Sequence, residues 1–213
     1  MDFAELISKE LIALWDKMYE RYDNSILDLF SEPEEGEPLS IIYKGRSVSN
    51  DLALSLYEYF TLTELLEFST IESIFEIGSG YGRTAYVIKK LHPNIKYTIF
   101  DLEPCLNLSK RYLGSVIQNN DIAFKNPDSI DGHCNLLLAI DCLHEMTPKT
   151  VKHYFDMADK VADSFYFSCW KETVLPEGIT WKQKDYPVKD SWRQLMSREH
   201  GIRKDYFEEF YEC

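Results

Sequence analysis

The chain has 213 residues, of which 45% are hydrophobic and 28% are charged. These proportions are typical of one globular domain with a sizeable core, and they exclude a disordered chain. Lys and Arg contribute 23 charges and Asp and Glu contribute 36, so the formal net charge is −13 at pH 7. This excess of negative charge disfavours a protein that binds nucleic acid or an anionic membrane, because phosphate groups would be repelled.

Hydropathy and cysteine spacing predict a soluble protein of the cytoplasm. The longest clean apolar run, at residues 136–140, is much shorter than the roughly 20 residues that a membrane span needs. The first residues are acidic and carry neither the basic nor the apolar region of a signal peptide. The five cysteines are scattered and form no Cys-x-x-Cys pair, so we expect neither a disulfide framework nor a zinc site.

Residues 1–48 are expected to form an N-terminal element of their own. Apolar side chains recur at helical spacing over residues 3–22, which predicts one amphipathic helix whose apolar stripe must be covered. The acidic stretch at 31–38 contains two prolines and few apolar residues, and it predicts a loop. This element would pack on its own domain, close over the site as a cap or lid, or form the contact surface of a homodimer.

Residues 49–213 are expected to form one domain in which strands and helices alternate. Ser49 has the side chain of a helix N-cap, and a very apolar helix follows it. The pattern then predicts strands at 74–77, 97–100, 122–124, 135–140 and 164–168, with helices at 81–91, 104–117 and 148–160. This order predicts an α/β fold with a parallel, doubly wound sheet that has helices on both faces.

A glycine-rich turn between the first of these strands and its helix carries most of the functional information. Its sequence is Glu76-Ile77-Gly78-Ser79-Gly80-Tyr81-Gly82-Arg83, and ligands of open α/β sheets bind at such turns. A dinucleotide-binding loop has the pattern G-x-G-x-x-G, but Arg83 stands where its third glycine would be. Glu76, at the end of the strand, favours a cationic ligand over a diphosphate. S-adenosylmethionine carries an ammonium and a sulfonium and no phosphate, so the charges favour this cofactor over NAD.

Two further acids follow the next two strands. Asp101 lies 21 residues after Gly80, where a carboxylate can accept hydrogen bonds from both hydroxyls of a ribose. Asp128 would contact the amino group of adenine, although Asn126-Pro127-Asp128 is equally suited to a simple turn.

Together, the glycine turn and Asp101 resemble motif I and the acid that follows it in class I S-adenosylmethionine-dependent methyltransferases. Three segments more narrowly resemble a family of sugar O-methyltransferases, namely 49–60, 101–113 and 141–146. The resemblance implies a Rossmann-like, seven-stranded, mostly parallel sheet with an antiparallel last strand, which residues 191–212 would supply. It also implies the residues that bind the cofactor, which are Glu76, Gly78, Ser79, Gly80, Gly82, Asp101, Leu102 and Asp128.

In this architecture the loop after the fourth strand faces the transferable methyl group. Here that loop contains Asp141, His144 and Glu145. A sugar hydroxyl needs a base, and an imidazole with an ordinary pKa near 6.5 can accept its proton near neutral pH. We expect His144 to be this base and Glu145 or Asp141 to orient it, while a purely structural histidine is the alternative. A His-Glu-x-x-His motif fails at Pro148, and no carboxylate cluster accompanies this loop, so we expect catalysis without a metal.

Three functions stay open at this point. The first is an O-methyltransferase that acts on a sugar or glycoconjugate, whose rings could stack on Trp170, Trp181 or Trp192. The second is a methyltransferase for another small-molecule hydroxyl or carboxyl acceptor. The third is a non-catalytic module that binds S-adenosylmethionine, which would gain support if His144 points away from the site. Arg83 is expected to be a solvated surface residue, and a contact with an anionic substrate is the alternative.

Overall fold

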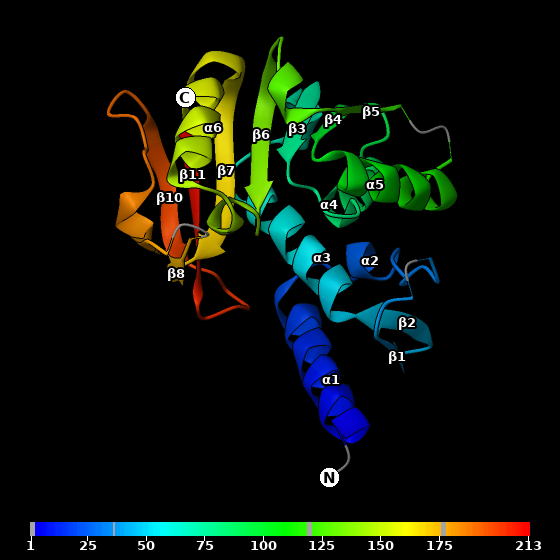
Figure 1. Cartoon of the computed structure of the whole chain (residues 1–213). Coiled ribbons are helices and arrows are strands. Elements are labelled where there is room, and N and C mark those ends of the chain that lie inside the picture. Colours follow the sequence, from blue (N-terminus) through cyan, green and yellow to red (C-terminus); the bar gives the residue numbers. More distant parts are fainter. Residues whose placement is uncertain (1–2, 36, 119–120, 176–177) are drawn as a thin grey trace.

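The centre of the molecule is a seven-stranded sheet with the strand order β10-β11-β7-β6-β3-β4-β5 (Figure 1). The computed structural model describes residues 3–35, 37–118, 121–175 and 178–213. The strands of the sheet are β3 (Ser73–Ile77), β4 (Lys96–Phe100), β5 (Ile122–Lys125), β6 (Cys134–Ile140), β7 (Ala162–Trp170), β10 (Arg193–Glu199) and β11 (Tyr206–Glu212). β3 to β7 pair in parallel, and β11 is antiparallel to both of its neighbours. The expected sheet with an antiparallel last strand is therefore confirmed.

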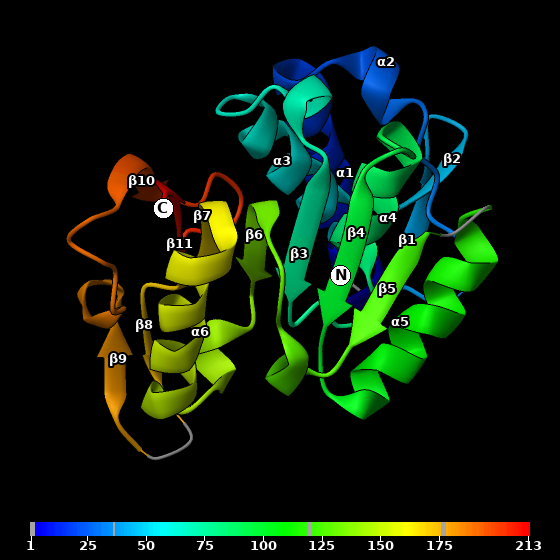
Figure 2. The same ribbon diagram turned by 90° about the horizontal axis from the view of Figure 1, so that it is seen from above.

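Helices cover both faces of this sheet. Successive side chains of a strand point to opposite faces, so strands that are apolar throughout must be covered on both. Ile74 of β3 packs in a hydrophobic cluster with residues of α3 (Asn50–Thr63), α4 (Arg83–Leu91) and α5 (Glu103–Val116). The next residue, Phe75, packs in a second cluster with α6 (Pro148–Val161). Figure 2 shows α3 and α6 on opposite sides of the sheet.

Local signals in the sequence explain where the helices begin. Ser49 caps α3 by accepting a hydrogen bond of 3.0 Å from the backbone N–H of Leu52. Thr147 caps α6 in the same way, through a bond of 3.2 Å from the N–H of Thr150, and Pro148 follows it as the first helical residue. A proline is tolerated there because the first N–H groups of a helix have no intrahelical acceptor.

The N-terminal residues share a hydrophobic core with the rest of the chain. They form α1 (Phe3–Arg21), the short helix α2 (Asn24–Leu27) and a hairpin of β1 (Ser40–Tyr43) and β2 (Arg46–Ser49). Trp15 of α1 is buried, and its indole Nε1 donates a hydrogen bond of 3.0 Å to the carbonyl of Ser49 at the start of α3. α1 contacts α3, which lies between α1 and the sheet in Figure 1.

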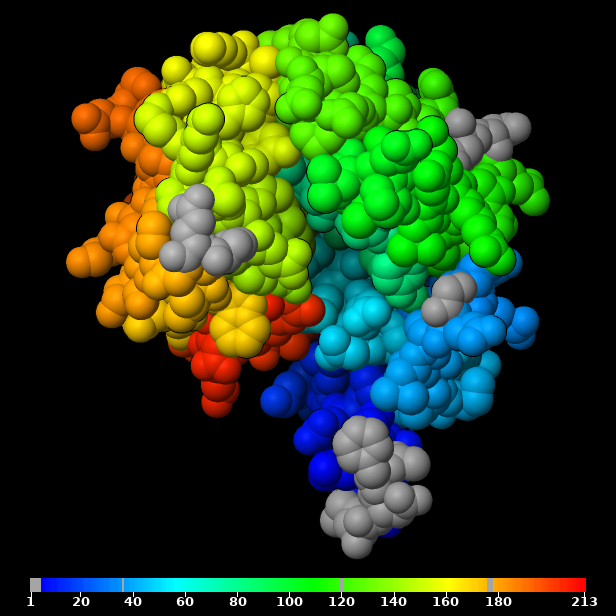
Figure 3. Space-filling view, in the orientation of Figure 1, coloured from blue at the N-terminus to red at the C-terminus, as the bar shows by residue number. Residues whose placement is uncertain are grey.

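The turn between β10 and β11 comes close to the N-terminal helix. Figure 3 shows the C-terminal hairpin beside the N-terminal helix and α3. Residues of α1, of α3 and of the turn Gly201–Lys204 line one cavity of about 760 Å³. The chain also forms a small hairpin of β8 (Glu172–Val174) and β9 (Thr180–Lys182) beside the sheet. In the described part of the chain, no helix is long and apolar enough to cross a membrane.

β3 marks the point where the order of the parallel strands reverses. β4 pairs with one of its edges and β6 with the other. The chain leaves the carboxyl end of β3 toward β4 and the carboxyl end of β6 toward β7, so these two adjacent connections run in opposite directions. Open α/β sheets bind their ligands in the crevice that such a reversal creates. The glycine-rich turn lies directly after β3 and therefore at this crevice.

Candidate active site

A cavity of about 210 Å³ lies at the carboxyl ends of β3 and β6. Its wall combines segments that are distant in sequence. They are the end of β3 with the glycine turn (Glu76, Gly78, Ser79), one face of α3 (Asp51, Ser55, Glu58), the start of α4 (Arg83, Thr84), the end of β6 (Ile140, Asp141) and Arg203. Larger cavities occur elsewhere on the described surface, but their described linings lack the glycine turn.

The glycine turn has a backbone that only glycine adopts readily. Gly78 and Gly82 have φ angles of +68° and +95°, in the left-handed region that side chains disfavour. A Cβ on Gly78 would lie 2.6 Å from the Cβ of Cys142 in the loop after β6, and one on Gly82 would lie 2.7 Å from Leu113 of α5. The turn is thus closely packed against the neighbouring segments, and its residues Gly78 and Ser79 line the cavity.

Asp101 ties the glycine turn to the end of β4. Its Oδ2 accepts a hydrogen bond of 3.2 Å from the N–H of Gly80, and its Oδ1 accepts one of 2.7 Å from the N–H of Leu102. Burial raises the pKa of this carboxyl, and the two N–H groups oppose the increase. The side chain of Leu102 is 66% exposed and offers an apolar surface beside the carboxylate.

Asp128 lies on the surface, after β5. It is exposed in the short 3₁₀ turn Pro127–Ser129, where its N–H donates a hydrogen bond of 3.0 Å to the side chain of Asn126. Its charge nevertheless acts on Tyr154, whose pKa is raised to about 12, mainly by burial and then by Cys142, Asp101 and Asp128. Asp101 and Asp128 thus both act electrostatically on Tyr154.

Two buried carboxyl groups face the cavity from different elements. Glu76 of β3 accepts a hydrogen bond of 2.9 Å from the hydroxyl of Tyr97, and Glu58 of α3 accepts one of 3.1 Å from the hydroxyl of Thr84. Burial raises the pKa of Glu76 to about 7 and that of Glu58 to about 8. Near neutral pH, both groups can therefore hold a proton that an incoming cation would displace.

Asp141 follows β6 and is held by the C-terminal hairpin. Its backbone is left-handed, with φ +54°, a conformation that Asp tolerates better than most residues. Its Oδ1 accepts a hydrogen bond of 2.6 Å from the hydroxyl of Tyr206, and its Oδ2 accepts one from Nη1 of Arg203. Both oxygens are thus oriented before any ligand arrives.

His144 lies behind Asp141 in the 3₁₀ turn Leu143–Glu145. Its Nε2 is 3.6 Å from Oδ1 of Asp141, and its ring packs edge-on against Trp170 and Tyr206. Its Nδ1 is buried without a hydrogen-bond partner in the described structure. Burial lowers the pKa of the imidazole, against the opposing effects of Asp141 and Glu145. Of these two carboxylates, Asp141 lies within ion-pair distance of the ring, whereas Glu145 is exposed and no ion pair joins it to His144 in the described structure.

Sequence reasoning missed several residues of this site and misplaced one. Glu58 had a signal, because it is the one charged residue in the apolar run from 52 to 62. Arg203 and Tyr206 had none, since their roles depend on contacts with Asp141 across 62 and 65 residues of chain. The expectation for Arg83 was wrong. Its guanidinium is buried and forms an ion pair with Glu32, because the N-terminal segment covers the start of α4.

Comparisons with known proteins identify a family and a fold. A family model described as an O-methyltransferase domain matches residues 39–162. No curated protein matches the chain. Among solved structures, the mitomycin 7-O-methyltransferase MmcR is 14% identical, with a TM-score of 0.58 over 75% of this chain and 54% of that one. The glycopeptide N-methyltransferase MtfA is 12% identical, with a TM-score of 0.58 over 76% of this chain and 90% of that one.

A third solved structure, the N-terminal domain of EvdMO1 with SAH bound, is 12% identical, with a TM-score of 0.50 over 88% of this chain and 93% of that one. The chain spans little more than half of the length of the mitomycin enzyme. At identities of 12% to 14%, these similarities concern the fold. The fold is that of a class I methyltransferase, as the resemblance implied.

Proposed function

The chain belongs to the O-methyltransferase domain family, and we propose that it transfers the methyl group of S-adenosylmethionine to a hydroxyl group of a sugar or glycoconjugate. The observation that carries this proposal is the cavity of about 210 Å³ where the glycine turn, two buried carboxyl groups and Asp141 meet. Family membership makes S-adenosylmethionine the cofactor, in agreement with the charges of the turn. The EvdMO1 domain of similar fold has SAH bound.

The residues at the carboxyl ends of the strands fit this cofactor. Ser79 offers a buried hydroxyl without a hydrogen-bond partner in the described structure, and it lines the cavity. Glu76 would receive the ammonium group, since a cation favours the ionised form of a buried carboxyl. Asp101 would accept hydrogen bonds from the ribose, and the exposed side chain of Leu102 would cover the adenine. Gly78, Gly80 and Gly82 would let the backbone approach the methionine moiety, and Asp128 would lie at the adenine end.

The chain's own residues must then place the acceptor and remove its proton. The bound cofactor supplies a methyl group that its sulfonium has already activated. We assign the role of base to His144, because burial lowers its pKa and keeps the ring neutral at pH 7. Asp141 would stabilise the ring once it is protonated, and Tyr206 and Arg203 hold Asp141 in position. Glu145 is exposed beside His144, where it would bind a second hydroxyl of the acceptor.

Trp170 supports a sugar as the acceptor. It ends β7, its side chain is 39% exposed, and its ring centroid lies 6.2 Å from that of His144. Tyr206 packs against it, with the ring centroids 5.0 Å apart. An indole face in this position would stack on the apolar face of a sugar ring and bring a hydroxyl toward His144. The other two candidate tryptophans lie elsewhere, since Trp192 is buried in the core beside α6 and Trp181 packs against the edge of that cluster.

The first experiment measures binding. Isothermal titration of the purified chain with S-adenosylmethionine, S-adenosylhomocysteine and NAD should give binding of the first two and none of the third. Tighter binding of NAD would overturn the cofactor assignment. Transfer of a labelled methyl group is then measured on a panel of sugars, nucleotide sugars, phenols, carboxylates and amines. Transfer to a class other than sugars would replace the proposed acceptor, and cofactor binding without transfer to any class would favour a non-catalytic binding module.

The N-terminal residues would serve this site as a cap. Arg83 lines the cavity, and Glu32 of the N-terminal segment pairs with it from outside. Residues of α1 and of the C-terminal turn border the larger cavity next to it. We propose that residues 1–48 close this side of the methyltransferase domain at 49–213.

A further inference from the structure

We propose that Arg203, in the turn between β10 and β11, binds the carboxylate at the amino-acid end of the cofactor. This inference rests on the proposed function, because it takes S-adenosylmethionine or S-adenosylhomocysteine as the ligand of the cavity. What carries it is the position of Arg203, which lines the same cavity as Glu76, Gly78 and Ser79.

Arg203 has hydrogen-bonding capacity that the described residues do not use. Its side chain is 31% exposed. A guanidinium has five N–H donors in a rigid fork. In the described part of the chain it makes one hydrogen bond, from Nη1 to Oδ2 of Asp141, and its carbon lies 4.7 Å from the centroid of the Tyr206 ring. Most of its donors therefore stay available to a carboxylate, which a guanidinium can bind through two parallel bonds.

The charges around the cavity match an amino-acid end, which is a zwitterion. Glu76 is an acid on the wall formed by β3, and Arg203 is a cation on the wall formed by the C-terminal turn. The other arginine at the cavity, Arg83, is already paired with Glu32 in a buried ion pair. An ammonium near Glu76 and a carboxylate near Arg203 would each meet the opposite charge. This pairing would also use the donors of Arg203 that its ion pair with Asp141 leaves free.

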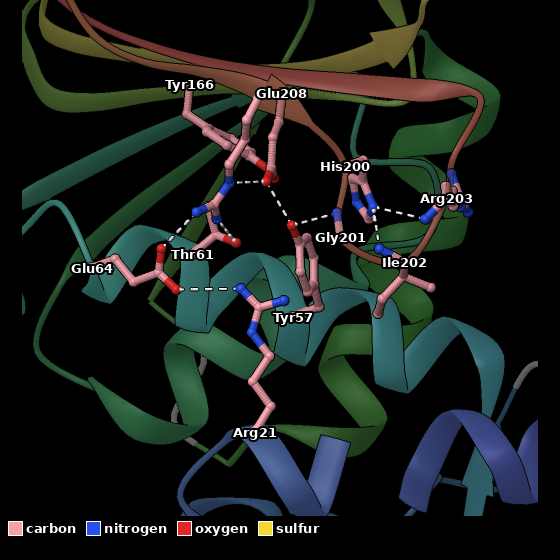
Figure 4. Close-up of polar contacts among 11 residues, drawn as sticks. Arg21, Tyr57, Thr61, Glu64, Tyr166, His200, Gly201, Ile202, Arg203 and Glu208 are labelled. Atoms are coloured by element: carbon pink, nitrogen blue, oxygen red, sulfur yellow. Dashed lines mark hydrogen bonds and ion pairs between the residues drawn. The ribbon is translucent and has the colours of Figure 1, made fainter. Parts of the chain in front are cut away.

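The turn that carries Arg203 is rigidly held, as Figure 4 shows. Nδ1 of His200 accepts hydrogen bonds of 3.2 Å and 3.0 Å from the N–H groups of Ile202 and Arg203. The hydroxyl of Tyr57 in α3 accepts one of 2.7 Å from the N–H of Gly201 and donates one to Glu208. Since both anchors are buried, the backbone of the turn is fixed before the ligand binds, and the bond to Asp141 orients the guanidinium, which lowers the entropic cost of binding.

A pair of ligands that differ only at the amino-acid end provides the test. 5′-Methylthioadenosine has the same nucleoside and thioether as S-adenosylhomocysteine but no amino-acid end. Titration calorimetry should give roughly 10- to 100-fold weaker binding of S-adenosylhomocysteine to Arg203→Gln than to the unmodified chain, as expected for the loss of a charge-assisted hydrogen bond. The affinity for 5′-methylthioadenosine should be unchanged. Lys204→Gln in the same turn is the matched control and should change neither affinity.

Each other result would overturn the inference. If Arg203→Gln weakens both ligands equally, the arginine supports the structure of the site. If it weakens the binding of neither ligand, the carboxylate of S-adenosylhomocysteine does not contact Arg203. Arg203→Lys keeps the charge and loses the fork, so it should give an intermediate loss for S-adenosylhomocysteine even if the Gln variant does not fold. Failure of the unmodified chain to bind either ligand would contradict the proposed function instead.

Discussion

The carboxylate of Glu32 forms a buried ion pair with the guanidinium of Arg83 and thereby joins the N-terminal segment to the helix that follows the glycine turn. The two side chains are 0% and 7% exposed. Glu32 also accepts a hydrogen bond from the hydroxyl of Ser49, the N-cap of α3. The guanidinium carbon lies 4.7 Å and 5.4 Å from the ring centroids of Tyr81 and Tyr112. The start of α4, next to the candidate cofactor site, thus depends on residues outside the family match at 39–162.

Glu32→Gln should lower the free energy of unfolding by about 3 kcal/mol, because it leaves the charge of Arg83 buried and unpaired. Urea unfolding followed by circular dichroism measures this loss. Glu34→Gln is the control, since Glu34 is exposed in the same segment, and it should change the free energy by less than about 0.5 kcal/mol. Equal free energies of unfolding for the two variants would show that the ion pair does not stabilise the fold.

Two glycines of the turn should respond differently to alanine although both have positive φ. Gly78→Ala meets the Cβ of Cys142 at 2.6 Å, whereas a Cβ on Gly80, with φ +56°, has no atom within 4 Å. We expect Gly80→Ala to cost about 1–2 kcal/mol, for the left-handed backbone alone. Gly78→Ala should cost more, because the loop after β6 must also move. Thermal unfolding measures both, and a loss for Gly78→Ala no larger than for Gly80→Ala would mean that Cys142 moves freely.

The alternation of strands and helices could be predicted because burial on both faces leaves continuous apolar runs, as at 136–140. The hairpin of β1 and β2 escaped prediction for a local reason. Its turn, Lys44-Gly45, has positive φ at both positions, and lysine is not among the residues that signal such a turn. A strand of four residues with a mixed pattern, such as Arg46–Ser49, also resembles a loop in sequence.

The candidate site was predictable only where it is continuous in sequence. The glycine turn, Asp101 and the loop of Asp141 each follow a strand, and parallel strands bring their carboxyl ends to one edge. Arg203 reaches this edge from an antiparallel hairpin, through a turn held by Tyr57 and His200. Tyr57 is 144 residues from its partner Gly201, and His200 is 3 residues from Arg203. No spacing pattern in the sequence predicts that these contacts bring Arg203 to the site.

The affinity for S-adenosylmethionine should rise with pH between about 6 and 8. Burial raises the pKa of Glu76 to about 7, so below that pH the group must lose a proton before it can pair with an ammonium. If binding displaces one proton from Glu76, the affinity falls by up to about tenfold for each pH unit below this pKa. Titration calorimetry across this range measures the effect. Glu76→Gln should bind more weakly and with a smaller slope, because only Glu58 then remains to lose a proton, and 5′-methylthioadenosine, which has no ammonium, should show no slope with either chain.

Stability should fall as His200 becomes protonated in acid. Burial, followed by the charge of Arg203, lowers its pKa from 6.5 to about 4, while Nδ1 accepts two backbone hydrogen bonds. Because its pKa is lower in the folded chain, the unfolded chain binds the proton more readily. The contribution of neutral His200 to the free energy of unfolding is therefore complete above pH 6.5 and is lost as the pH falls toward 4. The loss is on the order of 3 kcal/mol. His200→Gln should flatten the pH dependence of unfolding between these values, and His153→Gln, at an exposed position on α6, should not.

His144 should be required for methyl transfer and dispensable for cofactor binding. Its ring lies 3.6 Å from Asp141 at the edge of the site, and it does not line the cavity. His144→Gln should therefore lower kcat by roughly 10²- to 10⁴-fold, as for the loss of a general base, and leave the affinity for S-adenosylhomocysteine unchanged. Since burial lowers the pKa of the imidazole, kcat of the unmodified chain at saturating S-adenosylmethionine should stay high down to below pH 6.5 and fall only in stronger acid. His133→Gln is the control, because His133 is exposed and pairs with Asp163 away from the site. If His144→Gln transfers the methyl group as fast as the unmodified chain, His144 is not the base. Another group at the cavity, such as Asp141 or Glu58, would then accept the proton of the hydroxyl.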